Sequence, residues 1–156
     1  MEGNKHVDLE KAVQELLDRQ RIQDTLYRYA STIDDRNLKE LRELFVDDAV
    51  GRYGDGEPIH GADAIVAWID EMTVDCAWQH HKLTVYHVDI EGDEAKALTY
   101  HTSHQTTKAD PDVVTVIVAR YRDVLRRVGD GWRIADKVFD IGWSEQRSRP
   151  VPAELG

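Results

Sequence analysis

The chain has 156 residues, a length that suits one domain, and its 41% hydrophobic content is enough for a single sizeable core. Its 30 acidic and 20 basic residues give a formal net charge of −10, which argues against nucleic acid as a partner because a phosphate backbone would be repelled. No apolar run approaches the roughly 20 residues that span a bilayer, and the first residues lack the apolar centre of a secretory signal, so no membrane partner is expected.

Cysteine usage points to a reducing compartment. Cys76 is the only cysteine, so the chain forms no internal disulfide and no cluster of thiolate metal ligands. Free cysteines are usually buried as small hydrophobic residues. We therefore expect a packed Cys76 and a cytoplasmic protein.

The N-terminal third has the apolar periodicity of a helix. At about 100° per residue, two apolar sets point in nearly opposite directions, with the polar segment 18–21 between them. The first set is Leu9, Val13, Leu16 and Leu17, and the second is Ile22, Leu26, Tyr29, Ala30 and Ile33. The pattern allows a break near 18–21, or one long helix whose first turns pack elsewhere, for example on a second subunit. The second set is the better core helix.

Two shorter helices and a short strand are predicted next. Asn37, followed three residues later by Glu40, makes a capping pair for a short helix over 38–45. A short strand over 49–53 leads into a glycine-marked loop. A further helix over 62–72 has apolar residues at core spacing.

The second half of the chain reads as long strands separated by turns. The segments EGDE at 91–94 and GDG at 129–131 are tight-turn signals, and 108–112 is a loop. The predicted strands cover 78–90, 95–107, 113–128 and 132–143. Residues 144–156 are expected to form an extended tail. Helices followed by antiparallel strands indicate an α+β fold, whose curved sheet encloses a hollow for a small ligand.

Four stretches of this chain resemble the SnoaL-like branch of the nuclear-transport-factor-2-like superfamily. They are RQRIQDTLYRYASTIDDRNLKELRELFVDDAV, HGADAIVAWI, HHKLTVYHVDIEGDEAKA and YRDVLRRVGDGWRIADKVF, and they cover most of positions 18–141. The resemblance implies a single domain over 1–156 with its core at about 18–143. It also implies a cone-shaped α+β barrel, in which a curved, mostly antiparallel sheet wraps around the N-terminal helices.

The same resemblance implies the candidate catalytic residues. Asp34 matches the family aspartate after the first long helix, and His81 matches the histidine that opens the first long strand; these two form a dyad in scytalone dehydratase, bile-acid 7α-dehydratase and hexachlorocyclohexane dehydrochlorinase. Tyr29 matches the helix tyrosine of the bile-acid enzyme. His104 lies where relatives place an aspartate or a second histidine. The terminal-strand arginine of some relatives has no match, because Gly142, Trp143 and Ser144 occupy that region.

These residue types suit an elimination reaction. A histidine with a reference pKa of about 6.5 is largely neutral at pH 7 and can take a C–H proton, while a carboxylate at its other ring nitrogen stabilises the imidazolium. In this interpretation His81 is the base and Asp34 orients it. Tyr29 and Tyr53 donate to a carbonyl or leaving oxygen, and His104 protonates the departing hydroxyl.

Alternation along the strands assigns the remaining side chains. His81 shares a face with Leu83, Val85 and His87, and His104 shares a face with Leu98, Tyr100 and Thr102. His101 points the other way and is assigned, with His80 and His87, to the surface or an interface. We expect three further aromatic side chains to wall the hollow and bind substrate, namely Trp78, Phe139 and Trp143.

Metal and cofactor chemistry is not expected. His80 and His81 are adjacent on a strand and point apart, and the chain has no HExxH motif, no glycine-rich phosphate loop and no nucleotide-binding pattern. The sequence therefore predicts a cofactor-independent lyase that acts on a small hydrophobic cyclic compound. The alternatives are an isomerase or cyclase on the same dyad, and a binding or oxygenase accessory module without turnover. A homodimer or homotrimer built on the outer sheet face is expected from the relatives.

Overall fold

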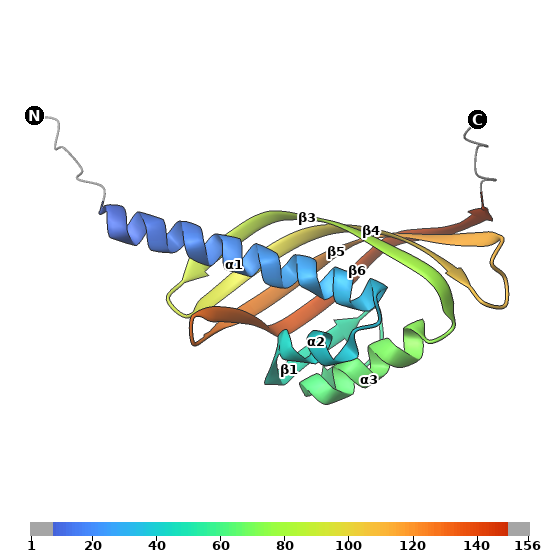
Figure 1. Ribbon diagram of the computed structural model, residues 1–156, viewed down its shortest axis with the longest axis horizontal. Helices are drawn as coiled ribbons and strands as arrows, with labels where there is room; N and C mark the ends of the chain where they lie inside the picture. Colours follow the sequence, from blue (N-terminus) through green and yellow to red (C-terminus); the bar gives the residue numbers. More distant parts are fainter. Residues whose placement is uncertain (1–7, 150–156) are drawn as a thin grey trace, which may run out of the picture.

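A long N-terminal helix lies across the concave face of a curled sheet, with two short helices at one end of the molecule (Figure 1). The computed structural model describes residues 8–149. The helices are α1 (Leu9–Asp34), α2 (Leu38–Glu43) and α3 (Ala62–Thr73). The strands are β1 (Phe45–Tyr53), β2 (Ile59–His60), β3 (Cys76–Glu91), β4 (Glu94–Thr107), β5 (Val113–Val128) and β6 (Gly131–Ser148).

The six strands follow the order β2-β1-β6-β5-β4-β3. All neighbours are antiparallel except β1 and β6, which pair in parallel. The two edge strands β2 and β3 do not pair with each other, so the sheet is curled but not closed into a barrel. The predicted α+β cone with a mostly antiparallel sheet is confirmed.

The N-terminal helix is one continuous element. It begins at a side-chain cap, where the Lys11 amide donates to the Asp8 carboxylate at 3.3 Å. At the polar segment that could have broken it, Asp18 is buried and accepts bonds from Arg127 at 2.8 and 2.9 Å and from the Trp132 indole at 3.0 Å. The Arg127 guanidinium holds the pKa of Asp18 well below its usual range. This segment is anchored to the sheet by its charge, so the helix continues through it.

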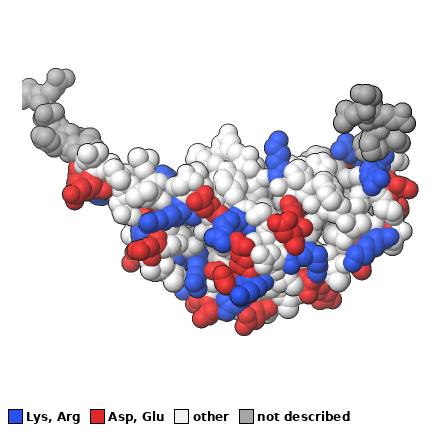
Figure 2. Space-filling view, viewed as in Figure 1, with Lys and Arg blue, Asp and Glu red and all other residues white. Residues whose placement is uncertain are grey.

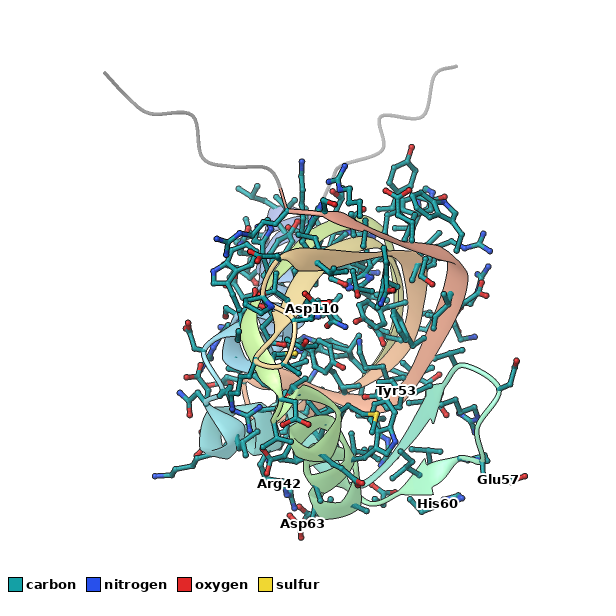
Figure 3. The ribbon with its side chains drawn as sticks, turned by 90° about the vertical axis from the view of Figure 1, so that its right-hand side faces the viewer. Arg42, Tyr53, Glu57, His60, Asp63 and Asp110 are labelled. Atoms are coloured by element: carbon teal, nitrogen blue, oxygen red, sulfur yellow. The ribbon has the colours of Figure 1, made fainter. Side chains whose placement is uncertain are left out.

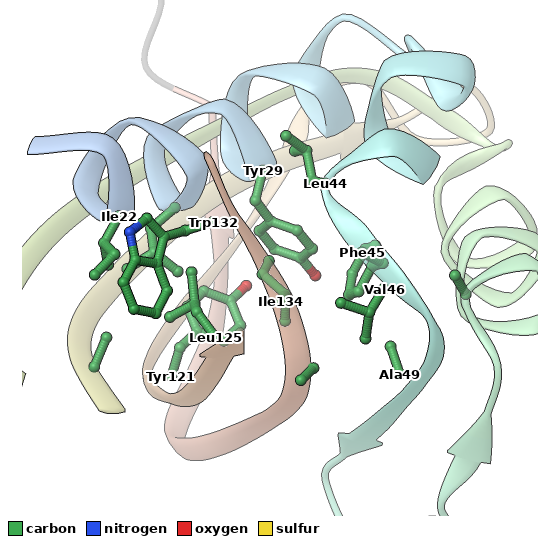
Figure 4. Packing of buried hydrophobic residues seen from close by; sticks show 14 of the residues in the cluster. Ile22, Tyr29, Leu44, Phe45, Val46, Ala49, Tyr121, Leu125, Trp132 and Ile134 are labelled. Atoms are coloured by element: carbon green, nitrogen blue, oxygen red, sulfur yellow. The ribbon is translucent and has the colours of Figure 1, made fainter. Parts of the chain in front are cut away.

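The two apolar sets of α1 have different surroundings. Its second set packs with residues of β1, β5 and β6 (Figure 4), including Phe45, Leu125 and Ile134. The first set stays exposed on the described part of the chain: Leu9, Val13, Leu16 and Leu17. The second set therefore belongs to the core, which also includes residues of α2 and α3, whereas the first set lies outside it.

Local signals placed most element ends correctly. The Asn37 side chain caps α2 by accepting from the Glu40 amide at 3.2 Å, as predicted. Gly92 and Gly129 adopt positive φ angles of 63° and 59° in the predicted turns. The predicted end of the last strand at position 143 was wrong, because β6 continues to Ser148 by pairing with β5. The rest of the predicted tail, 150–156, lies outside the described residues.

The surface seen in Figure 2 carries basic and acidic side chains side by side, with no large area of one sign. None of the helices within residues 8–149 is both long enough and apolar enough to cross a membrane. Burial raises the pKa of the Cys76 thiol, which is half-buried at the start of β3.

Candidate active site

Asp34 and His81 form a closely coupled pair at the end of α1. Nδ1 of the His81 ring lies 2.5 Å from Oδ1 of Asp34, and the His81 backbone amide donates to Oδ2 at 2.9 Å. The carboxylate accepts only, so the ring carries its proton on Nδ1 and leaves Nε2 as an acceptor. One carboxylate thus fixes both the position of the strand and the orientation of the ring. Sequence analysis had placed these two residues together.

The chain folds so that the helix end and the strand start meet. Asp34 is the last residue of α1, and the backbone then reverses through Arg36, which has a positive φ of 53°. Two residues before His81, the Gln79 side-chain amide donates to the Ile33 carbonyl at 2.6 Å. This bond satisfies one of the free carbonyls at the end of the helix and joins β3 to it.

A cavity of about 230 Å³ begins at this pair and runs between the sheet and α3. In the end-on view of Figure 3, Tyr53 lies between the curled sheet and α3. The wall is mainly aromatic and aliphatic, and its principal side chains are Tyr29, Ile33, Tyr53, Trp68, Ile69, His81, His101, Ile117, Tyr121 and Phe139. A water-poor wall of this kind strengthens every electrostatic interaction made inside it.

Tyrosine hydroxyls supply hydrogen-bonding groups to this cavity. The Tyr29 and Tyr53 hydroxyls are 3.2 Å apart. The Tyr53 ring stacks on Trp68 of α3 with centroids 4.3 Å apart. Burial raises the pKa of both phenols, so they remain neutral and can donate at any pH the fold tolerates. Tyr29, Tyr53 and Phe139 therefore lie where the sequence predicted them, on the cavity wall.

His101 is a cavity residue that sequence analysis had assigned to the surface. It is 2% exposed, and its ring centroid is 5.2 Å from that of His81. Neither of its ring nitrogens has a hydrogen-bond partner within residues 8–149. Burial lowers the pKa of His101 to about 3, and the charges of His81 and Lys137 act in the same direction. His101 is thus a neutral imidazole whose polar atoms are free for a ligand.

The predicted position of His104 in the site was wrong. Counting back from the turn at Gly92 pairs His81 with His104, but the register shifts between Val85 and His87, and His81 lies opposite Ser103 instead. The extra residue in β3 shifts the pairing with β4 by one position. Each β3 residue before the bulge therefore lies opposite a β4 residue one position away from the one that counting from the turn predicts. His104 therefore lies on the outer face beside His80, with ring centroids 6.1 Å apart.

Two tryptophans predicted to wall the hollow also lie elsewhere. Trp78 is 58% exposed and stacks on His80 on the outer face, and Trp143 is 52% exposed. His87, predicted to share a face with His81, is exposed because the same bulge places the buried side chain at Val88. Among the wall residues that these assignments missed is Trp68, whose helical spacing had indicated only core packing.

A buried ion pair adjoins the tyrosines. Lys137 of β6 is 1% exposed and donates to both carboxylate oxygens of Asp123 at 2.9 and 3.2 Å. Its Nζ lies 4.0 Å from the centroid of the Tyr29 ring and 3.8 Å from that of Tyr121. Alternation groups Asp123 with Tyr121 and Leu125, and Lys137 with Phe139, but it does not show that the two charges lie opposite each other; the pairing of β5 with β6 decides that.

The side chains of this site provide acid–base and hydrogen-bonding groups. Within the described range 8–149, no three His, Cys, Asp or Glu side chains are grouped as metal ligands. The arrangement combines one oriented base, one neutral imidazole and several phenol donors around a small apolar space. It can remove a proton from carbon and stabilise the negative charge that develops on a nearby oxygen.

Comparison with known proteins identifies relatives of the whole domain. The model of the SnoaL-like domain family matches residues 14–138. The uncharacterized protein Rv2910c of Mycobacterium tuberculosis is 30% identical over 131 residues, which cover 81% of this chain and 87% of that protein.

Solved structures share the fold at lower identity. Hexachlorocyclohexane dehydrochlorinase LinA-type3 from Novosphingobium barchaimii superposes with a TM-score of 0.78 at 14% identity, over 87% of this chain and 94% of that one. A nuclear transport factor 2-like protein with a cystatin-like fold from Novosphingobium aromaticivorans gives a TM-score of 0.72 at 24% identity, over 90% and 92% of the two chains. At these identities the likeness concerns the fold.

Proposed function

Because the chain belongs to the family of SnoaL-like domains, we propose that it is a cofactor-independent lyase that eliminates water or an acid from a small, neutral cyclic compound. The observation that carries this proposal is the two-point attachment of His81 to Asp34 at the wall of an apolar cavity. A dehydrochlorinase among the proteins of similar fold supports the reaction class. The dyad itself supports the choice of base.

In the proposed reaction, Nε2 of His81 takes a proton from a carbon atom next to a carbonyl group. The ionised carboxylate of Asp34 stabilises the imidazolium that forms. The electron pair of the broken C–H bond passes to an enolate, whose oxygen accepts a hydrogen bond from Tyr53, and Tyr53 in turn accepts one from Tyr29. When the enolate collapses, the new C=C bond expels the leaving group, which departs with the proton held by His81. His101 donates a hydrogen bond to the leaving atom.

The dimensions of the cavity limit the substrate. A cavity of about 230 Å³ is at the small end of ligand sites, which favours a compact substrate of one or two rings. The aromatic walls favour a flat molecule. Within residues 8–149, no lysine or arginine lines the cavity, which favours a substrate without a carboxylate or phosphate.

A screen of cyclic β-hydroxy ketones tests this proposal directly. Dehydration creates a conjugated enone, which is followed by its ultraviolet absorbance and by a product 18 mass units lighter, the mass of water. We expect turnover of at least one compound with one or two rings, and its loss in His81→Ala. If His81→Ala processes such a compound at the wild-type rate, the dyad is not the catalyst.

Isomerisation on the same dyad is the second candidate. The phenol donors would hold an enolate equally well if no group leaves, and His81 would then return the proton to another carbon. In heavy water, isomerisation gives a product of unchanged formula that contains deuterium, whereas elimination gives a lighter product. Tight binding without any product would favour a binding module.

The homo-oligomer stays a prediction. Large side chains on the outer sheet face are partly exposed, among them Trp78, Tyr86, Tyr100 and Trp143. They suit a contact between copies of the chain. Light scattering coupled to size-exclusion chromatography would give the number of subunits, and a monomer at micromolar concentration would contradict the prediction.

A further inference from the structure

The ion pair of Lys137 and Asp123 is not explained by fold stability. Both residues are buried, at 1% and 2% exposure, and they face each other across β5 and β6. Removing two charges from water is expensive, and a well-packed apolar pair in the same place is often as stable or more stable. Neither residue lines the cavity, so neither can touch a ligand there.

The contacts of Lys137 connect it to the cavity through the tyrosines. Its ammonium group lies over the faces of Tyr29 and Tyr121, and both rings line the cavity. A cation on a ring face is attracted by the π electrons and draws their density toward itself. The hydroxyl on such a ring becomes a stronger hydrogen-bond donor. The Tyr29 hydroxyl passes this effect to Tyr53, which is 3.2 Å away.

We propose that Lys137 is a positioning residue, and that the tyrosine cluster it polarises is an oxyanion site for phenols and enolisable ketones. The inference deepens the proposed function by naming the class of ligand, and it rests on that proposed function. A ligand oxygen that gains negative charge binds to this cluster more tightly than a neutral oxygen does. Asp123 keeps the ammonium in place and makes its burial tolerable.

The charges of the pair act in opposite directions on the phenols. Burial and the negative charge of Asp123 raise the pKa of Tyr29, Tyr53 and Tyr121, and the ammonium on the ring faces of Tyr29 and Tyr121 opposes that change. Burial lowers the pKa of Lys137, and the negative charge of Asp123 opposes that change. Asp123 and the two ring faces stabilise the ammonium. His101 is the titratable cavity residue whose pKa Lys137 lowers, which helps to keep that imidazole neutral beside the ligand. The buried ammonium of Lys137 thus favours a neutral imidazole at His101 over an imidazolium.

The probe for this site is 4-nitrophenol, a single-ring compound that absorbs visible light only when it is ionised. Titration of the bound probe gives its pKa in the cavity, and titration of the free probe gives the reference. In the wild-type protein we expect the ionised probe to bind roughly tenfold more tightly than the neutral probe, which lowers its pKa by about 1 unit. This measurement requires no turnover, so its outcome is independent of whether the protein proves to be a lyase.

The test variant carries Lys137→Met with Asp123→Leu, which removes both charges and keeps the volume. A second version, Lys137→Gln with Asp123→Asn, retains a buried hydrogen bond if the apolar pair does not fold. The control is Arg127→Met with Asp18→Leu, which removes another acid–base pair, formed by the buried Asp18 and the partly buried Arg127. We expect the preference for the ionised probe to disappear in the test variants and to persist in the control.

Substitution of the tyrosine donors shows whether the probe oxygen binds at the tyrosines or at His81. In Tyr29→Phe with Tyr53→Phe the preference should also disappear, whereas in His81→Ala it should remain. The proposal is overturned if the wild-type protein does not bind the ionised probe, or if the neutral-pair variants keep the wild-type preference. Loss of the preference in His81→Ala alone would also overturn it, because the oxygen would then lie at the dyad.

Discussion

The two faces of the β3–β4 hairpin carry the same residue type in different surroundings. On the inner face, His81 is bound to Asp34, and His101 is buried with no hydrogen-bond partner among residues 8–149. On the outer face, His80 and His104 stack near the exposed Trp78. The four histidines differ in their surroundings because of the side of the sheet on which each one lies. Under the proposed function, an acid–base site requires burial and a fixed carboxylate as well as imidazole.

One residue decides which histidine reaches which face. The bulge at Tyr86 shifts the register of β3 against β4, so His101 and Ser103 face the cavity in place of His104. The same substitution can therefore be made at an inner-face and an outer-face residue. Comparing the two variants separates a loss of catalysis from a loss of fold stability.

The largest difference is expected between His81→Ala and His80→Ala. Loss of the base should reduce turnover by about 10²–10⁴-fold, the usual range for general acid–base catalysis, whereas the outer variant should keep wild-type activity. The measurement is kcat/KM on a ketone found by the screen. Equal losses in both variants would place the chemistry outside the cavity.

The buried imidazole should control stability in acid. His101 has a native pKa of about 3, whereas in the unfolded chain its value is near the reference of about 6.5. Between these values the unfolded chain binds more protons, so stability falls as pH falls, by up to about 1.4 kcal/mol per pH unit.

Urea unfolding between pH 3.5 and 7 checks this dependence. His101→Phe should remove that part of the slope and leave stability at pH 7 equal or higher, since it removes buried polar atoms that have no partner in the described part of the chain. His104→Phe on the outer face should keep the wild-type slope. An unchanged slope in His101→Phe would show that the group is protonated in the native state.

A smaller effect is expected from single phenol groups. Tyr29→Phe keeps the ring and removes the hydroxyl that reaches Tyr53, and it should lower kcat by roughly tenfold, because the remaining donors still reach the enolate. Tyr100→Phe on the outer face is the control and should be neutral. A wild-type kcat in Tyr29→Phe would remove this hydroxyl from the mechanism.

The smallest effect is expected for the exposed ion pair on the outer face. Arg120 and Asp140 are both more than a third exposed and lie 2.8 Å apart. Asp140→Asn should change the free energy of unfolding by less than about 1 kcal/mol, since such pairs are screened by water and salt. Asp123→Asn should cost more, because it leaves the Lys137 ammonium buried without its charge partner. Thermal unfolding of the two variants compares the pairs.

The amino-acid sequence alone determined the order of elements, the ends of most of them and the family. Apolar periodicity, the Asn37 cap and the glycine turns act within a few residues, so they can be read locally. The resemblance placed Asp34 beside His81, and Tyr53 and Phe139 also reached the cavity wall. These residues lie on helix ends and strands whose positions the local pattern determines well.

Only the tertiary structure decided which strand residues face the cavity. A single bulge reversed the faces of His101 and His104, and register is a property of two strands together, so neither strand's own pattern contains it. The buried pair of Lys137 and Asp123 likewise depends on the pairing of β5 with β6 beneath α1. The sequence determined which groups are available for chemistry, and the packing of the sheet around α1 decided which of them meet.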